Sequence, residues 1–191
     1  MKYLFFLATI LITSNSACNK KKVTEKKTEK PSPSHVSEPG IKELPVSWKK
    51  FTSRDKLFEV ESPGLSSEGN GSYTDPSGQK RKVLKSYFRA GPYLYNIIYY
   101  KLNEEEKSEP PVLMLGKRAF GIHERLKATI SNRRTIKNGI HPGLAFDLKK
   151  GVETKQFRIF TTGDYLFILT TSFNGDNSAD SIRFLDSFKI L

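Results

Sequence analysis

The chain has 191 residues, which is room for one domain of ordinary size with appendages. Hydrophobic residues make up 37%, below the usual share of a globular protein, and the deficit is concentrated in residues 19–47. The single cysteine, Cys18, excludes an intrachain disulfide and a multi-cysteine metal site.

The formal net charge is +12. Residues 1–47 supply +4 of it, from eight lysines and four acids, and residues 48–191 supply the remaining +8. A basic surface favours anionic partners such as lipid headgroups, acidic glycans and nucleic acid. The simpler interpretation is a soluble, solvated surface, because net charge bears on association and not on fold.

The N-terminus has the pattern of a signal peptide. Lys2 precedes the run YLFFLATILI at residues 3–12, which is apolar except for Thr9. This run is shorter than the roughly 20 residues that a helix needs to span a membrane, and small polar residues follow it. We therefore expect residues 1–17 to be a cleaved signal peptide and not a spanning helix.

The sequence NSAC at residues 15–18 resembles a lipobox, in which small residues precede a required cysteine. Asn15 stands where the lipobox pattern has Leu, and in this the sequence resembles the relaxed lipoboxes of spirochaete lipoproteins. The resemblance implies cleavage before Cys18 and a diacylglyceryl group on its thiol. The protein would then be anchored in a bacterial envelope membrane, on the periplasmic face or at the outer surface. The alternative is ordinary cleavage that leaves Cys18 free.

Residues 18–47 are predicted to be a tether between the lipid and the domain. Lys, Glu, Pro, Ser and Thr dominate residues 19–47, so the segment buries too little apolar surface to offset its chain entropy and is expected to be disordered. Lys20–Lys22 would add attraction to anionic headgroups, and two or three acyl chains would make the attachment lasting. A sticky basic arm is the alternative interpretation.

Beyond residue 47 the pattern changes to short apolar runs separated by Gly, Pro, Asn and Asp. Period-2 alternation predicts strands at 48–52, 57–61, 82–90, 93–102, 128–137, 143–149, 154–161, 164–173 and 188–190. Turns are expected at Gly91-Pro92, Asn138-Gly139, Lys150-Gly151 and Gly163-Asp164. The Gly- and Ser-rich segment that ends near residue 79 is predicted to be a loop, and residues 103–111 a charged break.

Two helices are expected among these strands. Leu115, Ala119, Ile122 and Leu126 recur at helical spacing and predict an amphipathic helix over 111–126, although Gly116 and Gly121 weaken the pattern. A second helix is predicted over 178–186 from the buried stripe Ala179, Ile182 and Leu185, with Asp176, Asn177 and Ser178 as caps.

The predicted strand 164–173 is apolar on both faces. Phe167 and Leu169 lie on one face, and Leu166 and Ile168 lie on the other. A strand of this kind is typical of the centre of a sheet. Consecutive antiparallel strands with helices segregated between them indicate a single α+β domain over residues 48–191, with an antiparallel sheet flanked by helices.

Five stretches, in their order and spacing, resemble a known pattern. They are WKKFTS at 48–53, FEVESPG at 58–64, NGIHPGLAFDL at 138–148, QFRIFTTGDYLFILT at 156–170 and RFLDSFKI at 183–190. Together they resemble small secreted bacterial domains with the PsbP-like α/β/α sandwich. The resemblance implies that fold and a secreted setting. It carries no catalytic residue, because it consists of turn and core positions, and a fold alone does not give a function.

The sequence offers no pattern for catalysis or metal binding. His35, His123 and His141 are far apart, and no second histidine follows His123 one helical turn later. No GxSxG motif is present, and Cys18 is expected to carry lipid. The remaining aspartates are interpreted as strand-end, turn and cap residues: Asp147, Asp164, Asp176 and Asp180. We expect no enzymatic activity, no metal and no cofactor.

The candidate residues for binding an anionic ligand share a positive charge and are Lys80, Arg81, Lys82, Lys85, Arg89, Arg133 and Arg134, with Lys127 and Lys137 near the second group. Strand alternation puts Lys85, Tyr87 and Arg89 on one face, and Lys82, Leu84 and Phe88 on the other. The first set is a candidate for a basic, aromatic platform together with Tyr93, Tyr95 and Tyr99. The alternative is that the cations face water and the tyrosines pack in the core.

The leading functional hypothesis is a lipid-anchored, non-enzymatic binding or accessory module whose partner is a protein of the envelope or of a host. The alternative is an electrostatic binder of anionic glycan or lipid headgroups, whose binding falls steeply with salt. A hydrolase would require a deep pocket with shifted carboxylates or histidines. Nucleic acid is not expected as a partner outside the cytoplasm.

Overall fold

The computed structural model describes residues 47–74, 80–91, 93–174 and 178–191. The predicted signal peptide, Cys18 and nearly all of the predicted tether lie outside the described residues, as do the predicted caps Asp176 and Asn177. In the part of the chain that is described, no helix is long and apolar enough to cross a membrane.

The domain contains two sheets, and every pairing between described strands is antiparallel. A seven-stranded sheet has the order β3-β4-β5-β9-β8-β7-β6 and a three-stranded sheet the order β1-β2-β10. The strands are β1 (Trp48–Thr52), β2 (Phe58–Pro63), β3 (Leu65–Thr74), β4 (Lys80–Ala90), β5 (Tyr93–Lys101), β6 (Thr129–Asn138), β7 (His141–Lys150), β8 (Glu153–Thr161), β9 (Tyr165–Asn174) and β10 (Lys189–Ile190). The helices are α1 (Glu104–Ser108), α2 (Pro111–Leu126) and α3 (Ser178–Ser187).

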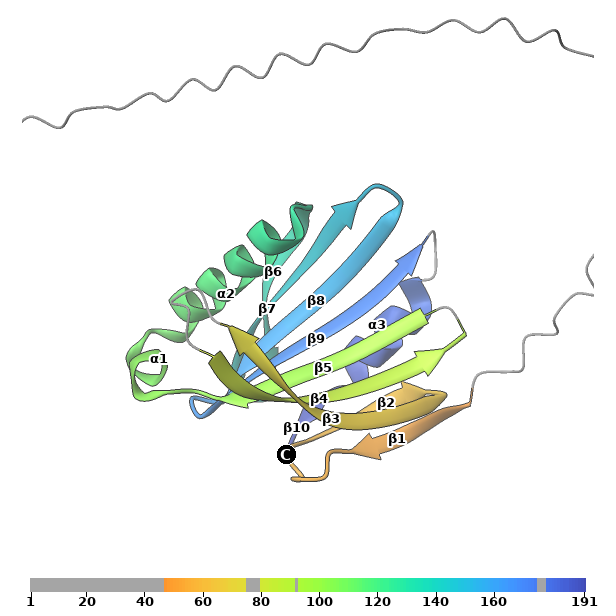
Figure 1. Cartoon of the computed structure of the whole chain (residues 1–191), viewed down its shortest axis with the longest axis horizontal. Coiled ribbons are helices and arrows are strands. Elements are labelled where there is room, and N and C mark those ends of the chain that lie inside the picture. The colour runs from red at the N-terminus through yellow and green to blue at the C-terminus, as the bar shows by residue number, and fades with distance from the viewer. Residues whose placement is uncertain (1–46, 75–79, 92, 175–177) are drawn as a thin grey trace, which may run out of the picture. The chain divides into compact units, whose positions relative to one another are not determined.

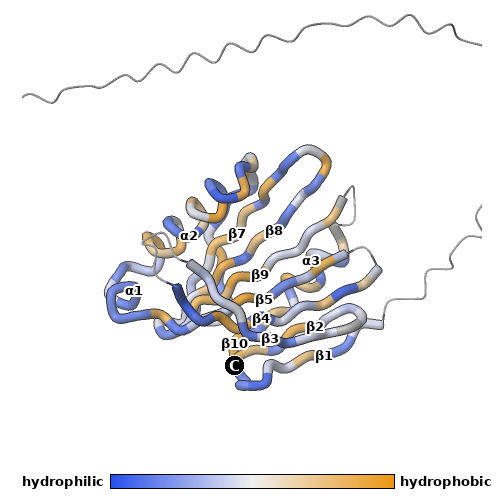
Figure 2. The backbone as a smooth tube through the Cα atoms, viewed as in Figure 1, coloured by the Kyte–Doolittle hydropathy of each residue, from blue (hydrophilic) through white to orange (hydrophobic). Residues whose placement is uncertain are grey.

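The seven-stranded sheet lies between two layers (Figure 1). One face, here the α3 face, packs against α3 and the three-stranded sheet through a core that includes Phe58, Phe88 and Phe167. The other, the α2 face, packs against α2 through a core that includes Leu115 and Phe146. Figure 2 shows hydrophobic stretches along the middle strands and a hydrophilic α1.

The hairpin turns form where the sequence predicts them. Asn138 pairs with His141, and Lys150 pairs with Glu153, so each connection is a two-residue turn. Gly139 and Gly151 take φ of 58° and 61°, in the left-handed region that a residue without a Cβ adopts at little cost. The predicted turns at Asn138-Gly139, Lys150-Gly151 and Gly163-Asp164 are confirmed as connections between strands, and of the predicted turn Gly91-Pro92, Pro92 lies outside the described residues.

The strand apolar on both faces, β9, occupies the middle position of the seven-stranded sheet. Phe167 and Leu169 pack on the α3 face, and Leu166 packs on the α2 face. The prediction of a central strand is confirmed, because only a strand with neighbours on both edges and layers on both faces buries both of its side-chain rows.

The prediction of a loop from residue 65 to about 79 is wrong over most of its length. Residues 65–74 form β3, which pairs with β4 from Leu65 opposite Arg89 to Thr74 opposite Lys80. The Gly and Ser composition wrongly indicated a loop. The hydrogen bonds that pair two strands come from the backbone, so a strand can form without any particular side chain. Gly71 even has a steric role, since a Cβ there would lie 2.5 Å from Lys85 Cε.

The prediction of a charged break over 103–111 is also wrong in part. Residues 104–108 form α1, a short helix that begins with a capping box. Asn103 Oδ1 accepts a hydrogen bond from the Glu106 backbone N–H at 2.8 Å, and Glu106 Oε2 accepts one from the Asn103 N–H at 2.9 Å. The predicted helix 111–126 is confirmed as α2, with Pro111 at its first position.

The predicted helix 178–186 is confirmed as α3, but its predicted buried stripe is wrong in part. Ala179 is exposed and Ile182 is 44% exposed, whereas Phe184 and Leu185 are buried and pack in the core on the α3 face.

The coarse fold prediction is confirmed: an antiparallel sheet with helices against it. The domain is richer in strand than the sequence predicts, because β3 adds an edge strand to the large sheet. The predicted strands at the two ends of the domain, β1, β2 and β10, pair with one another in a second sheet and do not join the large one.

Candidate functional site

Strand β4 carries most of the predicted anion-binding residues and sends them to two sides of the sheet. Leu84 and Phe88 pack into the core on the α3 face. Lys85, Tyr87 and Arg89 alternate with them and therefore belong to the α2 face, as Val83 does. The predicted division of this strand into two faces is confirmed.

The register across β4, β5 and β9 fixes the neighbours of these side chains. Lys85 lies opposite Ile98, Tyr87 opposite Asn96 and Arg89 opposite Leu94. Helix α2 packs over β7 and β8, so no described helix covers this part of the α2 face. We call these six residues of β4 and β5, which are half-buried or exposed, the open face.

The open face has polar groups that the domain itself does not use. No ion pair forms between Lys85 or Arg89 and any carboxylate in the described ranges, although Arg89 Nε donates to the Gly91 carbonyl at 3.2 Å. Asn96 Oδ1 is buried and accepts no hydrogen bond from the described residues. Two cations without a carboxylate partner among the described residues suit a ligand that carries negative charge.

The predicted tyrosine platform does not form as expected. Tyr95 and Tyr99 are 1% and 3% exposed and pack into the core on the α3 face, away from Lys85 and Arg89. Burial raises the pKa of Tyr95 to about 12 and also raises the pKa of Tyr99. The alternative, that the tyrosines pack in the core, is confirmed for these two, and Tyr87 alone shares the open face.

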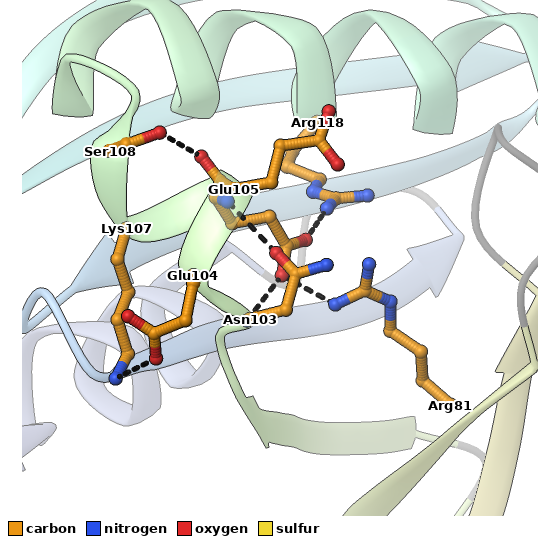
Figure 3. Close-up of polar contacts among 8 residues, drawn as sticks. Arg81, Asn103, Glu104, Glu105, Lys107, Ser108 and Arg118 are labelled. Carbon is orange, nitrogen blue, oxygen red and sulfur yellow. Dashed lines mark hydrogen bonds and ion pairs between the residues drawn. The ribbon is translucent and has the colours of Figure 1, made fainter.

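Arg81 is not available to an anionic ligand in the way the sequence predicts, because it joins an ion-pair network at the other end of β4. Its guanidinium pairs with Glu106 Oε2 at 2.5 Å, and Arg118 of α2 pairs with Glu106 Oε1. Figure 3 shows Arg81 and Arg118 reaching toward α1 from β4 and α2. The three side chains are 9–15% exposed, so this network joins β4, α1 and α2 in a largely buried setting.

A groove of about 920 Å³ runs beside this network, between α1, α2 and the adjoining ends of β3 and β4. Its charged lining residues are Arg81, Glu105, Glu106, Glu109, Lys117, Arg118, Glu124 and Arg125. Four acids and four bases leave no net charge to attract an anion. Both Glu106 oxygens accept from guanidinium groups, which makes this carboxylate a poor general base.

The second predicted cationic group lies on another strand at the far edge of the sheet. Arg133 and Arg134 belong to β6, which the strand order separates from β4 by four strands. A bulge at Asn132, whose φ is 51°, breaks the register between Ser131 and Arg134. The Arg133 guanidinium lies against α2 at Gly116. A Cβ on Gly116 would lie 3.3 Å from a guanidinium nitrogen of Arg133. The two cationic groups therefore form separate surfaces.

The described histidines are not clustered. His123 on α2 is half-buried, with Nε2 3.4 Å from Glu124 Oε1, while His141 begins β7. Within the described ranges, no three His, Cys, Asp or Glu side chains come together in a way that could hold a metal ion.

Sequence reasoning missed two features of this surface. The Glu106 network had a signal, the Asn-x-x-Glu capping pattern at 103–106, which predicts a helix start. The second is the β7–β8 turn, where the sequence Lys149-Lys150-Gly151-Val152 places an apolar side chain beside a turn glycine; Val152 is 83% exposed.

No protein-family model matches the chain, and no curated protein matches it. A crystal structure from Bacteroides thetaiotaomicron VPI-5482 is similar to it, with 15% sequence identity and a TM-score of 0.43. The match covers 75% of this chain and 48% of the other, so the chain spans about half the length of that protein.

Proposed function

We propose that the protein is a lipid-anchored lipoprotein of the bacterial cell envelope, acylated at Cys18, whose domain is a non-enzymatic binding or accessory module. The signal-peptide pattern, the lipobox-like NSAC and the polar segment before Trp48 support the anchor. A large sheet with helices on both faces supports a PsbP-like α/β/α sandwich as the finer description of the fold.

The anchor is tested by metabolic palmitate labelling and fractionation of wild type and Cys18→Ala. We expect wild type to be labelled and membrane-bound, and the variant to be unlabelled and released. An unlabelled wild type that is already soluble would contradict the anchor and would show that Asn15 defeats processing.

The partner of the domain is proposed to be a protein of the envelope or of a host, and one observation on α2 carries this. Leu113 and Phe120 are 52% and 63% exposed and lie two helical turns apart on one side of α2. The opposite side of the helix packs Met114, Leu115 and Ala119 into the core. Large apolar side chains kept in water beside a groove indicate a docking surface.

This docking surface is tested with a photo-crosslinking residue at Leu113 in cells of the native host. We expect a discrete crosslinked partner from this position, none from the exposed Lys82, and loss of the partner when Phe120→Glu is added. Equal crosslinking from Leu113 and Lys82 would show that the helix has no preference and would contradict the proposal.

A second candidate function, binding of acidic glycan or lipid headgroups, is favoured by the open face. Its cations, Lys85 and Arg89, flank Tyr87 on one face of β4. We expect retention on an immobilised acidic polysaccharide that falls steeply with salt. Lys85→Glu with Arg89→Glu should abolish retention, while the matched pair Arg133→Glu with Arg134→Glu on β6 should leave most of it. Equal losses would place binding in net charge and not in the open face.

A further inference from the structure

The tip of the β7–β8 hairpin exposes an apolar side chain next to its turn glycine. Gly151 provides the left-handed residue of the two-residue turn, and the position after it requires no apolar side chain. Val152 occupies that position and is 83% exposed, so it contributes little to the core. Figure 2 shows this tip as a hydrophobic point between hydrophilic stretches.

Lysines surround this tip. Lys149 and Lys150 precede the turn and are exposed, and Lys127 ends α2 nearby, two residues before Thr129, which pairs with Lys149. Lys150 and Lys155 line a small pocket with Leu126 and Ala128, which shows that the hairpin meets the end of α2. We call Lys127, Lys149, Lys150, Val152 and Lys155 the basic tip.

The basic tip keeps its positive charge. The acid nearest the turn, Glu153, pairs with Lys155 at 3.2 Å, and the other acid of the hairpin, Asp147, accepts a hydrogen bond from Asn132 Nδ2. No ion pair joins Lys127, Lys149 or Lys150 to any described carboxylate. Four lysines minus one glutamate leave three net positive charges around an exposed valine.

The opposite end of the sheet carries acids and bases together. The acids are Glu104, Glu105 and Glu106 in the first turn of α1 and Asp164 in the β8–β9 turn, and Lys107 pairs with both Glu104 and Asp164. Lys80 and Lys82, at the start of β4, also lie at that end. The β6–β7 turn there has the same construction as the tip, with Gly139 followed by the 89% exposed Ile140. The two ends therefore present comparable apolar turn residues, with acids among the bases at one end and mainly lysines at the other.

The chain from Cys18 reaches the domain at the end that holds the basic tip. One row of paired residues crosses the sheet from Arg89 through Leu94, Ser172 and Lys155 to Leu148, and so places the β4–β5 and β7–β8 turns at one end. Strand β1 begins at Trp48, whose ring lies 6.3 Å from that of Tyr95, near the β4–β5 turn. In Figure 1 the β7–β8 turn lies at the top of the domain, the β4–β5 turn at its right and the start of β1 at its lower right.

We propose that the domain lies on an anionic lipid bilayer by its basic tip, with Val152 inserted among the headgroups and Lys127, Lys149 and Lys150 against lipid phosphates. The inference rests on the proposed envelope anchor and adds which end of the domain meets the membrane. Docking by this end keeps the start of β1 on the bilayer side of the domain, whereas docking by the opposite end would put the length of the strands between Trp48 and the bilayer. Each lysine near an anionic surface strengthens binding about fivefold, and lipid on Cys18 would raise the local concentration.

The test uses the mature chain, residues 18–191, with Cys18→Ser as background and a single new cysteine that carries an environment-sensitive fluorophore. Val152→Cys reports on the basic tip, and Ile140→Cys is the matched control in the equivalent turn at the other end. The probe is a vesicle of phosphatidylglycerol and phosphatidylcholine, compared with one of phosphatidylcholine alone.

We expect the fluorophore at position 152 to brighten severalfold with the anionic vesicles only, and the fluorophore at position 140 to stay unchanged. Lys149→Glu with Lys150→Glu should weaken the response at least tenfold, and Lys80→Glu with Lys82→Glu, on β4 at the other end, should not. The basic residues before Trp48 are common to all variants, so they cannot produce a difference between positions 152 and 140.

Three outcomes would overturn the proposal: no response at position 152, equal responses at both positions, or retention on acidic polysaccharide without any response to vesicles. The last would favour the second candidate function over membrane docking. Palmitate labelling reports on the anchor independently. A labelled, membrane-bound wild type with a silent position 152 therefore rejects docking and leaves the anchor intact.

Discussion

The two faces of the seven-stranded sheet are covered to different extents. The α3 face is closed by a helix and a second sheet, and its core is mainly aromatic, with Phe58, Phe88, Tyr95 and Phe167 among the buried rings. The α2 face is covered over β7 and β8 and left open over part of β4 and β5. The same strand, β4, serves both faces, so neighbouring residues of one strand have opposite roles.

This difference separates stability from recognition. Residues on the α3 face are held by packing, and substitutions there should affect folding. The cations Lys85 and Arg89 of the open face and Lys149 and Lys150 of the basic tip form no ion pair with a described carboxylate, and substitutions there should affect binding with little effect on folding. Substitutions on the α3 face are therefore expected to change the free energy of unfolding more than substitutions on the open face.

The largest effect is expected from Phe58→Ala. Phe58 is fully buried, and its ring lies 5.4 Å from those of Tyr99 and Phe188, so it joins the small sheet to the large one. Removing it should lower the free energy of unfolding by about 3–5 kcal/mol, measured by denaturant titration. Phe120→Ala, at an exposed site on α2, should change it by less than about 0.5 kcal/mol. Similar losses for both would contradict the packing described for the two sides.

A slightly smaller effect is expected at the ion-pair network on the α2 side. Glu106→Gln removes the charge that Arg81 and Arg118 share and leaves two largely buried guanidinium groups without it. The loss should be about 3 kcal/mol in the same titration. Glu105→Gln, one residue away and exposed, is the control and should be nearly neutral. A neutral Glu106→Gln would show that the network adds nothing to stability.

High pH should destabilise the α3 face through Tyr95. Burial raises the pKa of this phenol from its ordinary value of 10.0 to about 12, so the unfolded chain loses the proton first. Stability is full below about pH 10 and falls as the pH rises through the folded pKa. At about 1.4 kcal/mol per pKa unit, the loss approaches about 3 kcal/mol near pH 12. Circular dichroism and phenolate absorbance against pH measure it, and Tyr95→Phe should remove its share of the slope.

The smallest effect on stability is expected on the open face. Lys85→Glu with Arg89→Glu should change the free energy of unfolding by less than about 0.5 kcal/mol, because neither cation pairs with a described carboxylate. Circular dichroism melting of this variant beside wild type checks it. A loss of several kcal/mol would show that these cations stabilise the fold, and the binding results for the same variant would then need another explanation.

The agreement between sequence and structure follows the strength of the local signal. β9 was predictable because its two apolar faces admit only a central position, and α2 because Leu115 and Ala119 repeat at helical spacing. β3 was not predictable from composition, because Ser and Gly form an edge strand here by pairing with β4. α1 carried a usable signal in Asn103 and Glu106 that the surrounding charges obscured.

The sequence predicted the residues of the candidate site less well than it predicted the fold. Alternation along β4 correctly separated Lys85 and Arg89 from Leu84 and Phe88. It did not reveal that Arg81 is taken by an ion pair, because Glu106 is 25 residues away along the chain. Tyr95 and Tyr99 were equally uncertain, since a tyrosine in a strand has the same pattern whether it faces a core or a ligand.

The sequence by itself determined the strands with strong alternation, the turns at Gly139 and Gly151, the course of α2 and the polar character of residues 19–47. These are local properties, set by side-chain period, backbone freedom and composition within about ten residues. Only the tertiary structure decided which face of β4 stays open, that the two cationic groups lie far apart, and that the basic tip shares an end with Trp48. Strand order and layer covering decide these, and they depend on pairings between segments that are distant in the chain.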